Sequence, residues 1–430
     1  MPKSFNRLID KYINALFKTR EVPEETRQEL WNVYNKKLSD AVDQGYSPKI
    51  DFYDKDLAKS LKENIAAFSA FKEESFKNVL GTLLVDEKGG LRPWNEFKKE
   101  AAKVNSAYNE RYLKTEYHQT IAAANAAQKW NDIERTKHLY PNLRYLTVGD
   151  NRVRDKHRAW HGKVLPIDHP FWVKNFPPND WGCRCDAERT DDEVTIEKEL
   201  PRTFDNDKFK NNPGLTGKVF PETVYAAGIT GDDFAQIAAR GIAWLSKVSK
   251  GDLQKYALEL FYKLPRKHQF RQIYRGENGG QVLEHWLNNK KAIDYNEIIE
   301  SSKLFADKGS YVEIMPEVTG QSVLKYHSKV FPDYGLNKNP DFRIDGIYYD
   351  LKRVSAIKNI RGNANKAYIN QKSRAVIHVD SKVNISEKIM QKRADDIFDI
   401  KNVDKEGKHN YQYNEVYFVH KNKLHKFNRP

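Results

Sequence analysis

Two aspartates and a lysine are crowded into the segment NPDFRIDGIYYDLK, residues 339–352. Apolar and polar residues alternate on both sides of the Asp-Gly dipeptide at 345–346. This dipeptide favours the two-residue turn of a β-hairpin, because both turn positions need positive φ. With the turn placed there, Asp341 lies opposite Asp350, with Cβ atoms about 5 Å apart. Lys352 shares their face because side chains alternate along a strand, so the spacing predicts a cluster of two carboxylates and one ammonium group.

This cluster predicts a divalent-cation site. Carboxylates directly opposite each other on a sheet repel, so they need a cation, a shared proton or a basic neighbour. Mg²⁺ or Mn²⁺ suits them best, because these ions take oxygen ligands and keep positions for water and phosphate oxygens. Lys352 would then orient the attacking water or offset charge on the phosphate. The alternative is a solvent-facing hairpin edge with ordinary ion pairs.

Basic side chains crowd the segment that follows the hairpin. They are Lys358, Arg361, Lys366, Lys372 and Arg374. The whole chain carries 73 Lys and Arg against 59 Asp and Glu, a formal charge of +14, which favours a polyanionic partner such as nucleic acid. We therefore expect phosphates to pass along this segment, with a solvated basic helix as the alternative. These residues do not separate RNA from DNA.

A second group of residues has the spacing of a zinc site. His157 and His161 stand at i and i+4, and Cys183 and Cys185 supply two soft ligands about twenty residues later, which suits tetrahedral Zn²⁺. Reduced buried thiols beside a core histidine, or a Cys/His nucleophile and base, are the alternatives. Because the chain has only these two cysteines, a disulfide framework does not stabilise the fold.

Four segments must position these groups. Residues 1–140 carry apolar side chains at helical spacing and predict a helical region. Residues 141–200 open with a short β-like run and then become dense in His, Trp, Pro and Cys, which predicts a small α+β motif domain. Residues 201–269 are interpreted as an extension and linker with one helix pair. Residues 270–430 alternate helices and strands, so the fold class is multidomain, ending in an α/β domain around one mixed sheet.

Individual elements of the last segment follow from the same patterns. Besides the hairpin, we expect helices at 279–291, 295–309 and 358–374 and strands at 311–317, 375–380 and 415–421. The chain has no run of about 18 apolar residues and no apolar leader with a cleavage site at its start. We therefore expect a soluble protein that is made in a cytoplasm and has no membrane partner.

The hairpin resembles the core of the PD-(D/E)XK nucleases, with Pro340-Asp341 as the first motif and Asp350-x-Lys352 as the second. More narrowly, the order from GSYVEIMPE through NPDFRIDG and DLK to a basic helix is similar to the tRNA nuclease domains at the C-termini of contact-dependent inhibition toxins. This resemblance extends over residues 280–425.

The resemblance implies several properties of the C-terminal domain. It implies a restriction-endonuclease-like fold, a metal-dependent ribonuclease that acts on tRNA, and an immunity protein as partner. It also implies that a glutamate of the first core helix, Glu284 in QVLEHWL, completes the metal site with Asp341 and Asp350. Gln371 would lie near the substrate. An exposed helical carboxylate and a polar helix surface are the alternatives for Glu284 and Gln371.

The His/Cys segment resembles the phage head-morphogenesis (minor capsid) proteins of the Mu F type over residues 145–190. The matching residues are Arg154, His157, His161-Gly162, Pro170-Phe171-Trp172, Pro177-Pro178-Asn179 and Cys183-Arg184-Cys185. The resemblance implies association with phage portal and capsid proteins and packaging in the phage head.

Together these features predict a phage minor capsid protein with a C-terminal nuclease toxin, located in the virion and in the cytoplasm of the bacterial host. Two alternatives remain open. One is a purely structural minor capsid protein whose tail binds nucleic acid. The other is a metal-independent ribonuclease of the barnase, EndoU or colicin type, in which His378, His409 or His420 acts as acid or base.

Overall fold

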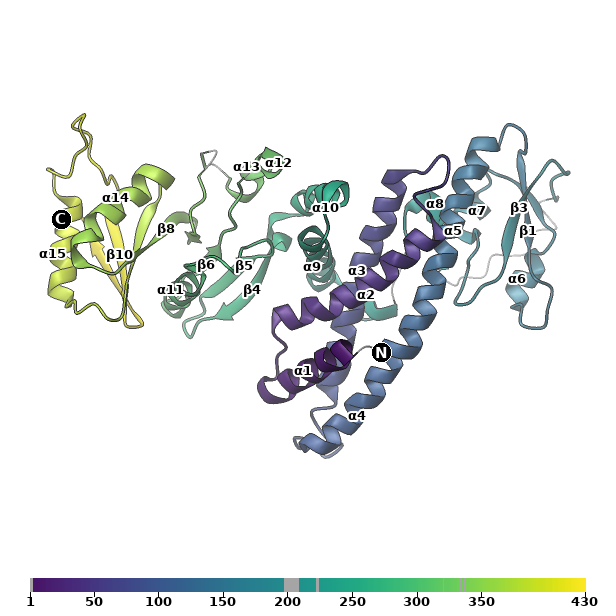
Figure 1. Ribbon diagram of the computed structural model, residues 1–430, viewed down its shortest axis with the longest axis horizontal. Helices are drawn as coiled ribbons and strands as arrows, with labels where there is room; N and C mark the ends of the chain where they lie inside the picture. Colours follow the sequence, from purple (N-terminus) through teal and green to yellow (C-terminus); the bar gives the residue numbers. More distant parts are fainter. Residues whose placement is uncertain (1–2, 197–208, 222–223, 320, 333, 336–337) are drawn as a thin grey trace. The chain divides into compact units, whose positions relative to one another are not determined.

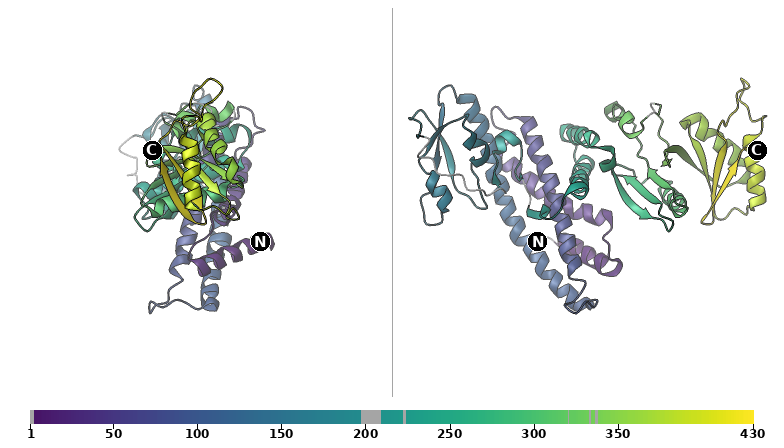
Figure 2. Two further views of the ribbon diagram at one scale, coloured as in Figure 1. Left: turned by 90° about the vertical axis from the view of Figure 1, so that its left-hand side faces the viewer. Right: turned by 180° about the vertical axis from the view of Figure 1, so that it is seen from behind.

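The computed structural model describes residues 3–196, 209–221, 224–319, 321–332, 334–335 and 338–430. The chain divides into two compact units, Met1–Ala257 and Leu258–Pro430, and each is described by itself. Figure 1 shows the first unit in purple to teal and the second in green to yellow, and Figure 2 shows the same elements from two other sides. The predicted motif domain and extension include residues 197–208 and 222–223, which lie outside the described residues.

The first unit begins with long helices. They are α1 (Lys3–Thr19), α2 (Glu24–Gly45), α3 (Lys55–Thr82), α4 (Trp94–Ser106), the π-helix η1 (Ala107–Tyr112) and α5 (Leu113–Thr136). α3 begins at Lys55 because the Asp54 carboxylate accepts hydrogen bonds from two main-chain N–H groups, those of Asp56 at 2.8 Å and Leu57 at 3.0 Å. The predicted helical character of the N-terminal part is confirmed.

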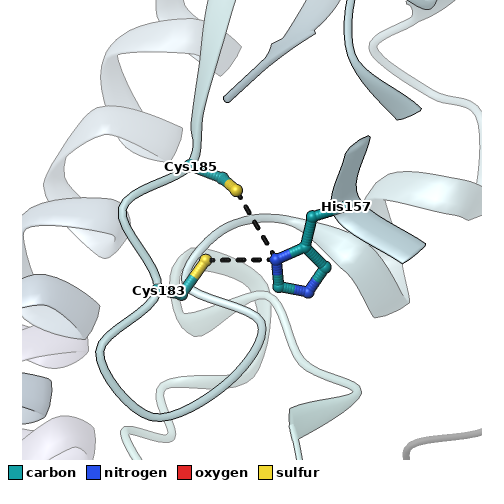
Figure 3. A group of neighbouring side chains, drawn as sticks. All are labelled: His157, Cys183 and Cys185. Atoms are coloured by element: carbon teal, nitrogen blue, oxygen red, sulfur yellow. Dashed lines mark hydrogen bonds between the residues drawn. The ribbon is translucent and has the colours of Figure 1, made fainter. Parts of the chain in front are cut away.

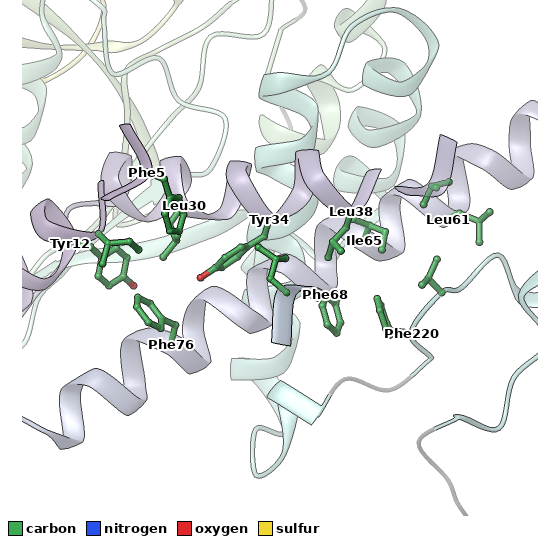
Figure 4. Close-up of a cluster of buried hydrophobic side chains, with 14 of the residues drawn as sticks. Phe5, Tyr12, Leu30, Tyr34, Leu38, Leu61, Ile65, Phe68, Phe76 and Phe220 are labelled. Atoms are coloured by element: carbon green, nitrogen blue, oxygen red, sulfur yellow. The ribbon is translucent and has the colours of Figure 1, made fainter. Parts of the chain in front are cut away.

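A common apolar core holds these helices together (Figure 4). Its larger members include Phe5, Tyr12, Leu30, Tyr34, Leu38, Leu61, Ile65, Phe68, Phe76 and Phe220. Along α3, Leu61, Ile65 and Phe68 recur every three to four residues and form one buried stripe. Full burial of each such side chain contributes about 1.5–3 kcal/mol, so packing, more than helix propensity, stabilises this part.

A small antiparallel sheet follows the helices, with β1 between its two neighbours. The elements here are β1 (Asn142–Leu146), α6 (Asp155–Trp160), β2 (Val164–Pro166), α7 (Pro170–Asn175) and β3 (Asp186–Thr190). An aromatic core packs beneath the sheet, and its members include Trp130, Tyr145, Trp160, Trp172 and Phe176. Trp160 and Trp172, from the segment dense in His, Trp, Pro and Cys, are therefore packing residues.

Short elements and the predicted helix pair follow. They are α8 (Pro213–Thr216), η4 (Val224–Ala226), α9 (Gly231–Val248) and α10 (Gly251–Lys263). α9 packs against α3 so closely that a Cβ on Gly241 would lie 2.8 Å from the main-chain oxygen of Ala66. Glycine is needed at that position because any side chain would push the two helices apart.

The second unit is built on an eight-stranded mixed sheet with the order β11-β10-β9-β8-β7-β6-β5-β4. Its strands are β4 (Phe270–Arg275), β5 (Gln281–His285), β6 (Tyr311–Ile314), β7 (Phe342–Ile344), β8 (Ile347–Val354), β9 (Arg374–Val379), β10 (Glu415–His420) and β11 (Lys423–Asn428). Its helices are η5 (Arg266–Gln269), α11 (Tyr295–Asp307), α12 (Gln321–Leu324), α13 (His327–Val330), η6 (Ile357–Asn359), α14 (Ile360–Gln371) and α15 (Glu387–Phe398). β8, β9 and β10 run parallel to one another, so the predicted α/β domain with a mixed sheet is confirmed.

Helices cover both faces of this sheet. Phe305 of α11 belongs to one core together with Val376 of β9. Met390 of α15 belongs to a second core together with Ile377, the next residue of the same strand. Successive strand residues point to opposite faces, so α11 lies on one side of β9 and the α14–α15 layer on the other.

One predicted helix is wrong. Residues 279–291 contain strand β5, which pairs with both β4 and β6. The short run QVLEH fits a helix and a strand equally well by periodicity. The preceding glycines mark the turn: Gly279 has φ +83°, and a Cβ on Gly280 would lie 2.2 Å from the main-chain oxygen of Ala306. The strands β4 and β11 and the helix α15 were not predicted.

Across the described ranges, no helix combines the length and the apolar character that crossing a bilayer requires.

Candidate functional site

The hairpin forms with the predicted register. Phe342 pairs with Tyr349, Arg343 with Tyr348, and Ile344 with Ile347. The turn residues Asp345 and Gly346 have φ of +48° and +87°, as the Asp-Gly dipeptide predicts.

Side-chain alternation puts the apolar residues of the hairpin on one face and its polar residues on the other. The apolar residues are buried, with one exception. Phe342, Ile344, Tyr349 and Leu351 are buried in the core under α11. Ile347 remains 37% exposed, because it follows the turn directly and lies beyond the edge of that core.

Asp341 lies where the pairing of β7 with β8 ends. The register stops at Phe342 and Tyr349, whereas β8 continues to Val354. The Asp341 carboxylate replaces a strand acceptor there, since its Oδ2 accepts a hydrogen bond of 2.7 Å from the main-chain N–H of Leu351. The chain before Asp341 is held as well, because the main-chain N–H of Asn339 donates to Oε1 of Gln371 at 2.8 Å.

Asp350 lies beside Lys352 in the interior of the site. Its side chain is almost fully buried, at 3% exposed for the residue, and it forms an ion pair with the Lys352 ammonium. Burial raises the pKa of Asp350, and Lys352 together with a hydrogen bond from Asp341 limits that rise. Burial and the charge of Asp350 raise the pKa of Asp341 well above its usual range. The structure therefore brings together the three residues that the hairpin predicted.

The charge of a third acid, which the sequence reasoning missed, acts on this pair. Asp294 is the residue before α11, and its charge contributes to the raised pKa of both Asp341 and Asp350. Its loop lies against β8, because the Arg353 guanidinium donates to the main-chain oxygen of Ile293 at 3.0 Å. The signal available in the sequence was an aspartate directly before a periodic apolar helix.

Glu284 does not complete a three-acid group with Asp341 and Asp350. It belongs to β5, and its placement on a helix is wrong. The registers of β5, β6 and β7 align Glu284 with Ile314 and Phe342, which puts it on the sheet face opposite to Asp350.

Glu284 is instead engaged in a buried ion pair. Its carboxylate accepts hydrogen bonds from Arg271 at 2.5 Å and from the Tyr295 hydroxyl at 2.7 Å. Burial raises the pKa of Glu284, but the charge and hydrogen bonds of Arg271 outweigh it and leave the pKa below its usual value.

The predicted nucleic-acid residues lie on and around α14. Lys358, Arg361, Lys366 and Lys372 are exposed. Gln371 is tied to Asn339, as described above, so it positions the chain before Asp341. Arg374 forms an ion pair with Glu415 at 3.0 Å.

The three histidines of the metal-independent alternative occupy different surroundings. His378 lies 3.2 Å from Glu300, and both line a cavity of about 610 Å³ with Arg353 and Lys421. The Nε2 atom of His409 lies 2.7 Å from the main-chain oxygen of Asp399. Burial and the charge of Lys421 lower the pKa of His420.

The His/Cys cluster of the first unit contains three of the four predicted ligands (Figure 3). The Nδ1 atom of His157 lies 3.8 Å from Sγ of Cys183 and 3.5 Å from Sγ of Cys185. Among the residues that the structure describes, this is the only group of three or more His, Cys, Asp or Glu side chains whose ligand atoms all lie within 4.8 Å of one another.

His161 lies outside the cluster. α6 ends at Trp160, and His161 has φ −54° and ψ 130°, so the helical i to i+4 relation to His157 is lost. Its Nδ1 instead accepts a hydrogen bond of 3.0 Å from the main-chain N–H of Thr147.

The two thiols differ in character. A hydrogen bond from Cys185, opposed by burial and supported by His157, lowers the pKa of Cys183 to about 4. The same thiol contact and burial raise the pKa of Cys185.

Comparison with known proteins identifies two parts of the chain. Residues 89–188 match the family model described as "Phage Mu protein F like protein". Residues 338–409 match the model described as "Contact-dependent growth inhibition CdiA C-terminal domain". The chain carries a Mu F-like domain and a CdiA C-terminal toxin domain. The His/Cys cluster falls in the Mu F-like domain, and the hairpin falls in the CdiA C-terminal domain.

Curated relatives cover the Mu F-like domain. The chain is 43% identical over 74 residues to the Mu-like prophage FluMu F protein of Haemophilus influenzae, which is 17% of this chain and 16% of that protein. It is 37% identical over 75 residues to the putative capsid assembly protein F of Escherichia phage Mu, which is 17% of each protein. The chain thus matches about a sixth of the length of these relatives.

Among solved structures, a chain of the CdiA-CT/CdiI toxin and immunity complex from Burkholderia pseudomallei matches part of this chain. The match covers 33% of this chain and 89% of that chain, at 17% identity and a TM-score of 0.22.

Proposed function

We propose that the CdiA C-terminal toxin domain is a metal-dependent, restriction-endonuclease-like nuclease that hydrolyses phosphodiester bonds in RNA, tRNA in particular. The observation that carries the proposal is the pair of the half-buried Asp341 and the buried Asp350 with the Lys352 ammonium beside it. A hairpin with only a structural role has no need to place two carboxylates together, because burial and the charge of Asp350 raise the pKa of Asp341.

The charge balance of this site suits Mg²⁺ or Mn²⁺. Asp341, Asp350 and Asp294 offer three carboxylates, whereas Lys352 offers one positive charge, so the ionised site lacks a cation. Asp341 and Asp350 would hold the ion, and the charge of Asp294 would add to its attraction. Such an ion, when bound, supplies charge neutralisation at a phosphate and lowers the pKa of a water molecule.

The residues of the chain position this chemistry. Two hydrogen bonds fix the Asp341 carboxylate directly before β7. One comes from the main-chain N–H of Leu351, and the other joins Gln371 to Asn339 in the preceding chain. Lys352 holds Asp350 and can offset negative charge that develops on a phosphate. Its ion pair also keeps the pKa of both aspartates from rising further.

A nucleic-acid partner is supported by the charge around the hairpin. The exposed cations of η6 and α14 follow β8 directly and can contact successive phosphates. The preference for tRNA rests on the resemblance of the hairpin region to the tRNA nuclease domains of contact-dependent inhibition toxins.

The Mu F-like domain supports a phage context. We propose that the chain associates with portal or capsid proteins, is carried in the virion and acts in the cytoplasm of the bacterial host. A cell that makes such a nuclease needs an inhibitor, so we also propose an immunity protein as partner.

The test is a cleavage assay with the full chain. Purified protein is incubated with total tRNA, other RNA and plasmid DNA, with Mg²⁺ or with EDTA. Asp350→Asn should abolish cleavage. Asp345→Asn is the matched control, because it makes the same change in the same hairpin at the turn, and it should cleave at the wild-type rate. Equal activity of Asp350→Asn and the wild-type protein would refute the assignment.

The same assay separates the alternatives. Cleavage that survives EDTA would favour the metal-independent ribonuclease, whose best-placed residues are His378 and Glu300 at the 610 Å³ cavity. No cleavage of any RNA or DNA would favour a structural minor capsid protein with a nucleic-acid-binding tail.

A further inference from the structure

The His/Cys cluster of the Mu F-like domain is assembled from two separate segments. His157 belongs to α6, whereas Cys183 and Cys185 belong to the chain that leads into β3. In Figure 3 both cysteine side chains point toward the same edge of the imidazole, the edge that carries Nδ1. Three ligand atoms brought together from two distant segments of the sequence form the kind of group that can hold a metal ion.

The burial of His157 also supports a bound ion. His157 is 1% exposed, and its ring stacks on Trp160 with centroids 5.5 Å apart, so the imidazole is held rigidly in the aromatic core. Its Nδ1 is directed at the two sulfurs at 3.5 and 3.8 Å. Buried polar groups are normally satisfied, and a single ion would satisfy the imidazole and both sulfurs together.

The donor set selects the type of ion. One imidazole nitrogen and two cysteine sulfurs are the ligands of Zn²⁺, with Zn–N of about 2.0 Å and Zn–S of about 2.3 Å. A nitrogen and a sulfur at these lengths around one ion lie about 3.5 Å apart in a tetrahedron, which is close to the 3.5 and 3.8 Å between Nδ1 of His157 and the two sulfurs. Hard ions such as Mg²⁺ prefer oxygen ligands instead.

A cavity beside the two cysteines leaves room for a fourth ligand. Cys183 and Cys185 line a cavity of about 320 Å³, together with Lys129 and Asp186. Lys129 and Asp186 form an ion pair at 2.5 Å, so each is already engaged. A water molecule in the cavity would therefore be the fourth ligand.

We propose that the Mu F-like domain binds one Zn²⁺ ion through Nδ1 of His157 and the sulfurs of Cys183 and Cys185. The ion joins α6 to the segment before β3 and so stabilises the small sheet domain. This site is independent of the nuclease proposal, because it lies in the first unit and uses none of the residues of the hairpin.

The first experiment measures metal content and coordination. Full-length protein without an affinity tag is purified under reducing conditions, and its zinc content is measured by elemental mass spectrometry. We expect about one zinc per chain. After replacement of zinc by Co²⁺, we expect thiolate-to-cobalt charge-transfer absorption and the intense visible bands of tetrahedral cobalt.

Variants assign the ligands. His157→Gln, Cys183→Ser and Cys185→Ser should each lose the zinc and the charge-transfer absorption. His161→Gln is the matched control, because it removes a neighbouring histidine that lies outside the cluster, and it should retain both. Asp350→Asn should also retain both, which separates this site from any metal held by the hairpin.

A second measurement covers variants that fold poorly. A zinc chelator should lower the melting temperature of the wild-type protein and of His161→Gln, and zinc should restore it. Wild-type protein that carries no zinc, shows no charge-transfer absorption with Co²⁺ and melts at the same temperature with chelator would overturn the proposal. A Cys183–Cys185 disulfide in protein purified under reducing conditions, or equal zinc loss in His157→Gln and His161→Gln, would overturn it as well.

Discussion

The main-chain N–H of Leu351 donates a 2.7 Å hydrogen bond to the carboxylate of Asp341. β7 begins only at Phe342, so it supplies no main-chain acceptor opposite Leu351. The side chain of Asp341 therefore completes the ladder of β8, and the same contact fixes the carboxylate beside Asp350. Asp341 thus has a structural role, as a hydrogen-bond acceptor for the main chain, and a place in the site. The two roles can be tested separately.

Asp341→Asn separates the two roles. The amide oxygen of Asn can still accept from Leu351, so we expect the melting temperature to change little. The loss of the negative charge should lower the cleavage rate by about 100-fold or more, since even indirect ligand supports are worth about 10- to 100-fold in metal affinity or activity. Cleavage rate and thermal unfolding of the same preparation test this, with Asp345→Asn as control. A variant that cleaves normally but unfolds early would reverse the assignment.

Without bound metal, in the presence of EDTA, the free energy of unfolding should fall as the pH rises. Burial raises the pKa of Asp341 and of Asp350 in the folded protein, so between about pH 4 and the raised values the folded state binds more protons than the unfolded state. The free energy of unfolding then decreases with increasing pH across this window. Calorimetry of the wild-type protein should show this decrease, and Asp341→Asn should weaken it.

Mg²⁺ or Mn²⁺ should oppose that decrease. An ion that binds only the folded state stabilises it, and it binds best when both aspartates are ionised. We therefore expect added Mn²⁺ to raise the melting temperature more at about pH 8 than at about pH 5, and not at all in Asp350→Asn. A shift of equal size at both pH values would contradict a carboxylate site.

Lys352→Met should move the acidic limb of the pH–rate profile to higher pH. Lys352 opposes the rise in the pKa of both aspartates, so its removal leaves them protonated up to a higher pH. Lys352→Arg should restore part of the profile, because it keeps the positive charge. Lys358→Met is the control, since Lys358 is exposed, and its profile should keep the wild-type shape.

Glu284→Gln should lower stability, whereas Asp294→Asn should weaken the response to metal. Glu284→Gln breaks the buried pair with Arg271 and should cost about 3 kcal/mol of unfolding free energy, with an unchanged metal requirement in the folded protein. Asp294→Asn removes a charge that repels the aspartate pair, so the fold should be retained. The metal concentration for half-maximal cleavage should instead rise by about 10-fold. Urea unfolding and a Mn²⁺ titration of cleavage distinguish the two, and a metal defect in Glu284→Gln would restore the original assignment.

The sequence by itself was sufficient for features that depend on local patterns. The Asp-Gly turn placed Phe342 opposite Tyr349, and strand alternation placed Asp350 and Lys352 on one face. The motif of the Mu F-like domain predicted three of the residues that meet in the His/Cys cluster. Each of these relationships follows from backbone geometry over a few residues or from a dense local motif.

Only the tertiary structure decided which distant residues join each site. QVLEH is short enough to fit either periodicity, and its pairing with β4 and β6 makes it a strand, which puts Glu284 on the sheet face opposite to Asp350. His161 has the spacing of a ligand, but α6 ends before it. Both outcomes depend on where an element ends and what packs beside it, and long-range contacts determine these, not the local sequence.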